Sequence, residues 1–454
     1  MTFSPGSLLS SLNSLLPDDW QQRKLLIALS GGMDSVVLLH SLCALKTQGK
    51  LSNPLSAVHI NHGLQTQADD WQQHCEELCD QLGVPIHSEA VEVVVSASGS
   101  GLENAARVAR YQVFESRMDE QTVLLQAHHR DDQMETLLLR LMRGAGALGL
   151  SGIPACRALA NGLLARPLLV FDRSWLQGWA EQQGLRWQED ESNADEQFDR
   201  NYCRRSLLPM IEKRWPAYRE SWSKTVALES ESAQMLQSLA EIDLQACLSD
   251  CGKGVKVTAA MELDEPRRRN MVRYWISAMG LADPGWNRLR QLSMEVLPAA
   301  QDSAGIELES YMLQRFRSVL FAVSNAVHTV QEEQASWDIG ASSQIELTDN
   351  GSLEAISQNG KGLSLAKCED LDIRYRQGSE SCQLAGRPTK MLKKILHEER
   401  IELWLRSRMP LLYSGDTLVC IPGVGVAEGF QAQGDEQGWQ INWQKPAMLY
   451  APDL

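Results

Sequence analysis

The stretch of sequence that decides the fold is Leu25-Leu26-Ile27-Ala28-Leu29-Ser30-Gly31-Gly32-Met33-Asp34-Ser35-Val36-Val37-Leu38-Leu39. Its first apolar run predicts a buried parallel strand, and its second predicts a helix that starts directly after a loop of small residues. The N–H groups at a helix N-terminus are unpaired, and the helix dipole attracts an anion to them. The stretch therefore predicts an α/β domain with an anion-binding loop at the end of its first strand.

This loop contains the residue types that suit a phosphate. Gly31 and Gly32 let the backbone approach a phosphate closely, and Ser30 and Ser35 add hydroxyl donors. A carboxylate repels phosphate unless a cation lies between them, so Asp34 indicates a bridging magnesium ion. The loop is not a Walker A motif, because neither Gly-Lys-Ser nor Gly-Lys-Thr follows it. The alternative interpretation is a glycine turn in an ordinary α/β domain.

Composition narrows the class of protein. The 454 residues, 43% of them apolar, suffice for roughly two to four domains. No apolar run reaches the length of a membrane span, and residues 1–20 lack the features of a secretory signal. Ten cysteines without a Cys-x-x-Cys pair argue against zinc ribbons and many iron–sulfur sites, and reduced cysteines fit a cytoplasmic protein. The net charge of -15 argues against nucleic-acid binding through the electrostatic field of the whole protein.

The order of patterns along the chain predicts several domains. Alternating strands and helices indicate a doubly wound, mostly parallel sheet in residues 1–217. A helical domain over 218–325, a loose connector with some strand over 326–366 and a small α/β domain over 367–454 are expected to follow. The strands expected in the first domain are 25–29, 55–60, 86–95, 122–127 and 163–168; the last domain is expected to have strands at 371–375, 411–413 and 417–421 and a helix at 389–398.

Two further motifs follow predicted strands, where ligands bind in open α/β sheets. One runs from His59 to Leu64, and the other is His128-His129-Arg130-Asp131-Asp132-Gln133-Met134-Glu135-Thr136. Carboxylates that only stabilise a helix dipole, or a hydrolytic metal site, are the alternative interpretations of the second motif. Helical spacing places Asp132, Thr136, Arg140 and Arg143 on one face and predicts that Leu137, Leu138, Leu141 and Met142 face the core.

Basic residues form local clusters within this acidic chain. Arg107 and Arg110 lie three apart on a predicted helix and together suit a phosphate or a carboxylate. For every cluster the alternative is a solvated helix face. The other clusters are Arg204, Arg205, Lys213, Arg214 and Arg219, which follow an acidic and amide-rich loop, then Arg267–Arg269, and then Lys390, Lys393 and Lys394.

Together these motifs resemble those of the tRNA(Ile)-lysidine synthetase family of N-type ATP pyrophosphatases, which carry a PP-loop. The family pattern combines Ser-Gly-Gly-x-Asp-Ser, His-Gly-Leu, Gly-x-Glu-x-x-Ala-Arg-x-x-Arg-Tyr, His-x-x-Asp-Asp-x-x-Glu-Thr with a later Arg-Gly, Asp-x-Ser-Asn-x-Asp, and Arg-Asn-x-x-Arg. The resemblance extends over nearly the whole chain, although the usual Gly-Gly-Glu-like start of the C-terminal module is Gly378-Ser379-Glu380 here. The matches begin, in order, at Ser30, His62, Gly101, His128, Asp190 and Arg200, and the C-terminal module is matched by Leu392–Leu396, Trp404, Arg408 and Pro410.

The resemblance implies an adenine nucleotide alpha hydrolase-like fold and a reaction in two steps. ATP adenylates the carbon-2 oxygen of the wobble cytidine in tRNA(Ile) with a CAU anticodon, and free lysine then displaces AMP. The product base, lysidine, pairs with adenosine, so that the tRNA reads AUA. Implied roles are ATP binding by Ser30, Gly31, Gly32, Met33, Asp34 and Ser35, with Asp34 on magnesium; contact of Arg107 with the nucleotide or the activated base; lysine binding by Asp132, Glu135 and His128; and tRNA binding by Arg200, Arg204, Arg205, Lys393 and Lys394.

Other functions remain open from the sequence. A tRNA cytidine thiolase typically carries Cys-x-x-Cys, which this chain lacks, and a small-molecule ATP-dependent synthetase would not need the basic helical region. A non-catalytic RNA-binding protein on a decayed fold is the third rival, and the intact Asp34, Asp132 and Glu135 speak against it. The resemblance implies no permanently bound cofactor, and the oligomeric state, a homodimer included, stays undetermined.

Overall fold

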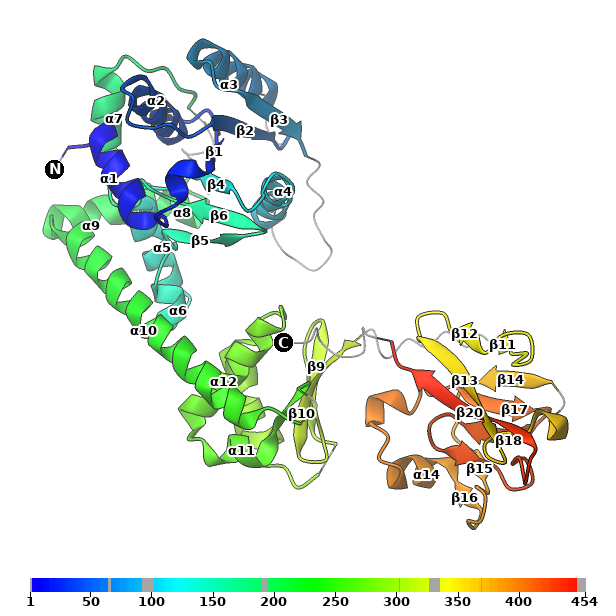
Figure 1. Cartoon of the computed structure of the whole chain (residues 1–454). Helices are drawn as coiled ribbons and strands as arrows, with labels where there is room; N and C mark the ends of the chain where they lie inside the picture. Colours follow the sequence, from blue (N-terminus) through cyan, green and yellow to red (C-terminus); the bar gives the residue numbers. More distant parts are fainter. Residues whose placement is uncertain are drawn as a thin grey trace. The chain divides into compact units, whose positions relative to one another are not determined.

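The computed structural model describes residues 2–63, 67–91, 102–189, 195–250, 252–301, 303–325, 335–368 and 370–446, with side chains of the third range from 105 onward. The chain forms two compact units, Met1–Gln234 and Met235–Leu454 (Figure 1). The boundary falls within one long helix, α10 (Tyr218–Cys247). Among the described residues, no helix combines the length and the apolar character that a membrane crossing requires.

The first unit is built on a six-stranded sheet of order β3-β2-β1-β4-β6-β5. Its central strand β1 pairs in parallel with β2 on one side and with β4 on the other, and only β5 runs antiparallel. The predicted doubly wound, mostly parallel sheet is therefore confirmed, with β5 as the strand that the sequence did not reveal. The strands are β1 (Lys24–Ala28), β2 (Leu55–Asn61), β3 (Ile86–Ala90), β4 (Thr122–Leu125), β5 (Cys156–Leu159) and β6 (Gly162–Ala165).

Successive residues of β1 point to opposite sides of the sheet, and helices cover both of these sides. Leu25 and Ile27 pack into one core with helices from both ends of the domain, whereas Leu26 packs with Phe114 on the other face. A buried strand of this kind explains the continuous apolar run at 25–29. The helices of the first core are α1 (Pro5–Leu15), α2 (Met33–Thr47), α3 (Ala68–Leu82) and α7 (Arg173–Gln182), and the second face carries α4 (Leu102–Ser116).

The helix α5 (Arg130–Met142) departs from its predicted burial. Met134 and Leu138, one turn apart, pack against residues of the helices that follow. Leu141 and Met142 were expected in the core but are 57% and 72% exposed. Leu141 lies about one turn beyond Leu138 on the same side of α5. Among the described residues, Leu138 is the last buried residue of α5 in this cluster. After α5 come α6 (Ala147–Leu150), α8 (Asp199–Tyr202), a π-helical turn (Cys203–Leu207) and α9 (Leu208–Arg214).

The second unit starts with a helical region that also contains a sheet. Its helices α11 (Val257–Glu262), α12 (Glu265–Ala278) and α13 (Gly285–Gln291) share one core with a sheet of order β7-β10-β9-β8. Within the predicted cluster Arg267–Arg269, Arg268 is buried and donates to the carbonyls of Ala260, Leu263 and Ser293. Its role is structural, so Arg268 is not part of a solvated basic face. The strands are β7 (Gly254–Lys256), β8 (Gly305–Glu307), β9 (Tyr311–Phe316) and β10 (Val319–Ser324).

The predicted connector over 326–366 needs correction in its described part. Residues 326–334 lie outside the described residues, but β13 (Ser352–Asn359) pairs along its whole length with β20 (Gln437–Gln444). β13 has the mostly polar sequence Ser-Leu-Glu-Ala-Ile-Ser-Gln-Asn, and none of its last four residues is buried, so it lacks the continuous apolar run of a buried strand. The remaining strands and helix of this module are β11 (Ala335–Ser336), β12 (Gln344–Glu346), β14 (Leu371–Arg374), β15 (Ser381–Cys382), β16 (Lys390–Met391), α14 (Leu392–Glu398), β17 (Leu411–Ser414), β18 (Thr417–Ile421) and β19 (Gly425–Val426).

Candidate active site

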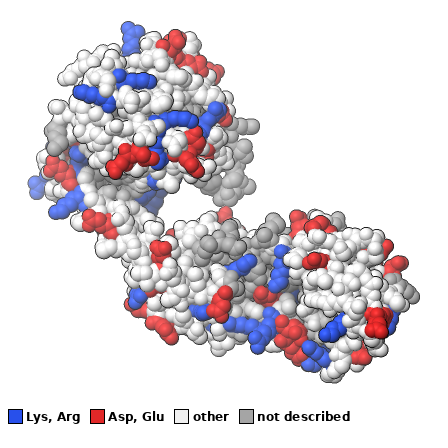
Figure 2. Space-filling view, viewed as in Figure 1, with Lys and Arg blue, Asp and Glu red and all other residues white. Residues whose placement is uncertain are grey.

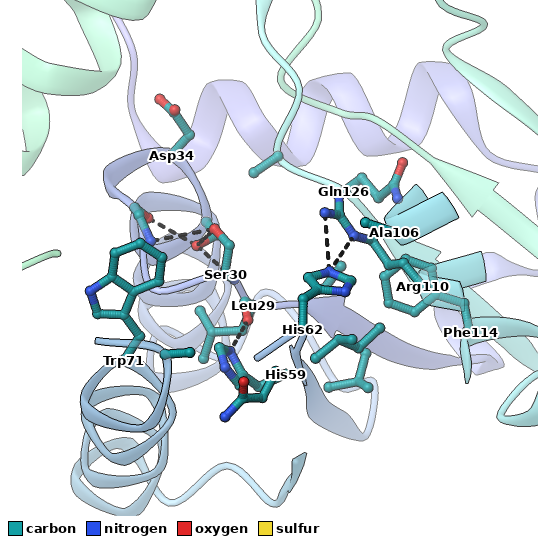
Figure 3. A pocket seen from close by; sticks show the side chains of 18 of the residues that line it. Leu29, Ser30, Asp34, His59, His62, Trp71, Ala106, Arg110, Phe114 and Gln126 are labelled. Atoms are coloured by element: carbon teal, nitrogen blue, oxygen red, sulfur yellow. Dashed lines mark hydrogen bonds between the residues drawn. The ribbon is translucent and has the colours of Figure 1, made fainter. Parts of the chain in front are cut away.

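A cavity of about 640 Å³ lies at the carboxyl ends of β1, β2 and β4 (Figure 3). Since β1 pairs with β2 and β4 on its two sides, the cavity occupies the point where the strand order reverses. That is where open α/β sheets bind ligands, and the volume is in the range of small-molecule sites. The three predicted motifs meet here, because the walls include Ser30, His62, His128 and Asp132.

The loop before α2 is held in shape by its own hydroxyls. Ser35 Oγ donates to the carbonyl of Gly32 at 2.9 Å and lies 3.1 Å from Ser30 Oγ, while the N–H of Gly32 donates to Ser30 Oγ. Gly31 has a φ of +83°, a conformation that favours glycine, and an added Cβ would lie 3.1 Å from Cys75 Sγ. Met33 is buried in the core, so only its backbone is available to a nucleotide. The loop is thus preformed at the helix N-terminus.

Asp34 stands in the first turn of α2 with one oxygen unsatisfied. Its Oδ2 lies 3.6 Å from Nε2 of His129, whereas its Oδ1 is buried without a hydrogen-bond partner among the described residues. A buried carboxylate oxygen of this kind fits a Mg²⁺ ion, which prefers oxygen ligands and usually takes one or two carboxylates together with phosphate and water. The described residues hold no group of three or more His, Cys, Asp or Glu that could bind a metal alone, so phosphate oxygens would supply further ligands.

Asp132 and Glu135 lie on the inner face of α5 and are both buried. Arg200 donates to Glu135 Oε2 at 2.8 Å and to Asp132 Oδ1 at 2.9 Å. Arg204 donates to Glu135 Oε1 at 2.6 Å and to Asp132 Oδ1 at 3.3 Å. The π-helical turn that begins at Cys203 places this second arginine beside the first. Two carboxylates are thus balanced by two guanidinium groups, whose side chains stay 39% and 31% exposed.

Two histidines at the start of α5 have opposite electrostatic environments. Burial, with help from the nearby arginines, lowers the pKa of His128 to about 4, and its Nδ1 accepts from Arg166. Burial alone would lower the pKa of His129, but the carboxylates of Asp132 and Asp34 outweigh it and raise that pKa. Asp132 itself has a pKa lowered to about 2, since the positive charges of His129 and Arg200 overcome its burial. It therefore stays ionised at neutral pH.

Of the two arginines on α4, the structure brings Arg110 rather than Arg107 to the cavity. Arg107 is exposed, with its guanidinium 5.6 Å from the ring centre of Tyr111. Arg110 donates from Nε to His62 Nε2 at 3.3 Å, and Figure 3 shows this pair across the cavity from Trp71. Burial, and then the positive charge of Arg110, lower the pKa of His62 to about 4. The two arginines could not be ranked from the sequence, because both lie within one turn of the helix.

The neutral state of His62 leads to a pH-dependent effect on stability. Its pKa is about 6.5 in an unfolded chain and about 4 in the fold, so the contribution to stability is present above 6.5 and is lost as the pH falls toward 4. Because the pair is partly exposed, we expect a contribution on the order of 1 kcal/mol. His62→Asn should therefore unfold with a weaker dependence on pH between 6.5 and 4 than the unchanged protein in urea titrations. An identical dependence would contradict the assignment.

The remaining residues predicted to bind tRNA are exposed and do not line the cavity. Arg205 is exposed and lies 3.7 Å from Glu196, and Lys393 and Lys394 lie on the exposed side of α14. Four residues that line the cavity had no predicted role there: Trp71, Phe114, Gln126 and Phe198. Trp71 shares an apolar helical stripe with Cys75 and Leu78, which is also the pattern of a cavity wall. Matched family positions that lie outside the described residues are Leu64, Gly101, Asp190, Ser192 and Asn193, and the side chain of Glu103 does as well.

Comparison with known proteins identifies the family of this chain. Family models match a PP-loop domain at residues 7–211, a TilS substrate binding domain at 256–321 and a TilS substrate C-terminal domain at 371–443. A tRNA(Ile)-lysidine synthase of Coxiella burnetii is 38% identical over 98% of this chain and 97% of the relative. The chain belongs to the tRNA(Ile)-lysidine synthase family. Synthases of this name from Pseudomonas fluorescens and Yersinia pseudotuberculosis are 38% and 34% identical, over 97% and 99% of the chain and 96% and 99% of their own lengths.

The three family models of the tRNA(Ile)-lysidine synthase family match successive parts of the chain. The PP-loop model covers the six-stranded sheet and the cavity, and the two substrate-domain models fall on the helical region and on the C-terminal module. The resemblance and the fold class predicted from the motifs are both confirmed.

Proposed function

We propose that this protein ligates free lysine to carbon-2 of the wobble cytidine of tRNA(Ile) with a CAU anticodon, through an adenylated cytidine, at the expense of ATP. The observation that carries the proposal is the cavity itself. It brings the anion-binding loop at Ser30–Ser35 and the acidic residue Asp132 to one space of about 640 Å³. One side suits a triphosphate, and the other suits an amine.

The first step needs a nucleotide held with its α-phosphate exposed to the cytidine. The N–H groups of the loop and the N-terminus of α2 provide fixed donors for the outer phosphates. Asp34 would hold Mg²⁺, which when bound supplies positive charge that stabilises the leaving pyrophosphate. Arg110 lines the cavity on the opposite wall, and Arg107 remains a candidate only if it leaves its position above Tyr111.

The second step needs the lysine side chain beside carbon-2. Asp132 and Glu135 supply two negative charges for its ammonium group, but Arg200 and Arg204 now hold both carboxylates. Lysine binding therefore requires that one guanidinium gives up part of its contacts, and the partial exposure of both arginines makes them accessible to RNA phosphate. His128 is neutral, and because its Nδ1 accepts from Arg166, its Nε2 carries the hydrogen and can donate to an oxygen of the substrate.

Binding of tRNA(Ile) must depend on local basic groups rather than on the electrostatic field of the whole protein. Figure 2 shows Lys and Arg side chains interspersed with Asp and Glu over the visible face, in keeping with the net charge of -15. Arg200 and Arg204 bond to Asp132 in the cavity wall, Arg205 follows Arg204 and is exposed, and Lys393 and Lys394 lie exposed on α14. We assign the three arginines to the anticodon region and the two lysines to a second tRNA contact.

The test is incorporation of radiolabelled lysine into purified tRNA(Ile) with a CAU anticodon. We expect incorporation that requires ATP and releases AMP and pyrophosphate in equal amounts. A tRNA with its wobble cytidine changed to uridine is the control and should remain unlabelled. Absence of label with every component present would overturn the proposal, as would equal labelling of the control. Label that appears from sulfide instead of lysine would indicate a thiolase.

A further inference from the structure

We propose that Phe198, with Tyr202 beside it, forms a stacking platform for an unpaired base next to the wobble cytidine. The inference rests on the proposed function and extends it to a part of the RNA that does not react. Phe198 lines the cavity together with His128 and Asp132, yet 55% of it is exposed. Phe198 is therefore an aromatic side chain at the mouth of the cavity, and the side of its ring that faces away from the cavity is open to solvent.

Phe198 and Tyr202 together form an exposed aromatic patch. Phe198 precedes α8, and Tyr202, four residues later and 46% exposed, lies on the same side of the helical turn. Arg143 at the end of α5 lies 4.0 Å from Asp199 in α8, next to Phe198. Soluble proteins rarely expose several large apolar side chains together unless the patch binds a partner.

The chemistry of the cavity identifies the partner as a nucleobase. Reaction at carbon-2 requires that the wobble base leave the stack of the anticodon loop and enter the cavity. Its neighbours then lose a stacking partner at the mouth, where Phe198 presents a ring. Unpaired RNA bases are commonly held by aromatic side chains in this way.

Charge at the rim favours RNA over an apolar protein partner. Arg143 and Arg205 flank the patch and, among the residues that the structure describes, pair with exposed carboxylates, at 4.0 Å to Asp199 and 3.7 Å to Glu196. Exposed ion pairs of this type contribute little free energy, so phosphates can replace the carboxylates at small cost. An aromatic platform between exchangeable arginines is the arrangement used for single-stranded nucleic acid.

The experiment measures lysidine formation by the full chain with variants at Phe198. Phe198→Ala should raise KM for tRNA(Ile) roughly tenfold with little change in KM for ATP, as expected for loss of one stacked base. Phe198→Trp should restore KM to within about twofold, because it restores the aromatic face. Phe198→Leu retains apolar volume without a ring and should resemble Phe198→Ala. Trp215→Ala removes another exposed aromatic residue of the same unit, 62% exposed and not part of the cavity, and should be unchanged.

A second arm removes the base instead of the ring. Synthetic tRNA carries an abasic nucleotide on the 5′ or the 3′ side of the wobble cytidine. With the unchanged protein one of these should raise KM roughly tenfold, and Phe198→Ala should add little to that loss. If the loss caused by Phe198→Ala adds fully to the loss caused by each abasic nucleotide, the platform is wrong. Equal impairment of the Ala and Trp variants, or an unchanged KM in Phe198→Ala, would also overturn it. Failure of the unchanged protein to modify any tRNA would instead overturn the proposed function.

Discussion

Asp132→Asn is expected to lower lysidine formation by about a thousandfold while pyrophosphate release from ATP and tRNA continues. The buried pair Asp132 and Glu135 is now balanced by Arg200 and Arg204. Removal of one carboxylate leaves a net positive charge where the lysine ammonium must bind. Two unit charges about 4 Å apart interact with roughly 4 kcal/mol in a partly solvated site, which corresponds to about three orders of magnitude.

The two half-reactions separate this effect from a general loss of the enzyme. Pyrophosphate release without lysine, and transfer of label from α-labelled ATP to tRNA, report the adenylation step. Both should stay within about tenfold in Asp132→Asn, so that adenylated tRNA accumulates. Asp80→Asn changes an exposed carboxylate of α3 and should match the unchanged protein. Full lysine incorporation by Asp132→Asn would remove the anchoring role, and loss of both steps would assign Asp132 to the first.

The sequence was sufficient to predict where this site lies, because the segments that form its anion-binding loop are adjacent in the chain. A strand, a glycine loop and a helix N-terminus follow one another in the chain, so Ser30–Ser35 could be assigned to an anion site directly. The ends of β2 and β4 were also predictable, since parallel strands of one sheet present their carboxyl ends at the same edge.

What the sequence did not reveal depends on contacts between distant segments. Arg200 and Arg204 were expected to contact tRNA, and nothing local indicates that they reach Asp132 and Glu135, some 65 residues earlier. The position of His129 between Asp34 and Asp132 likewise depends on the juxtaposition of α2 and α5. β13 was missed for a related reason, because its pairing partner β20 lies at the far end of the chain.

Asp34→Asn is expected to abolish both half-reactions, by at least two orders of magnitude, with tRNA affinity kept within about twofold. Asparagine retains the shape of the side chain but not the charge that draws Mg²⁺ to the phosphates. Chelation of Mg²⁺ should give the same loss in the unchanged protein, and ATP should bind Asp34→Asn with little dependence on Mg²⁺.

This second prediction also distinguishes a catalytic carboxylate from a structural one. Oδ1 of Asp34 is buried without a partner in the described part of the chain, a costly arrangement for the protein by itself. Neutralising such a group should leave the melting temperature without ligand close to that of the unchanged protein, apart from the weak attractions to His129 at 3.6 Å and to Arg173 at 4.0 Å. A large fall in melting temperature would show that Asp34 supports the fold. Normal pyrophosphate release by a stable Asp34→Asn protein, or activity that persists in excess chelator, would show that the triphosphate is held without a metal at this residue.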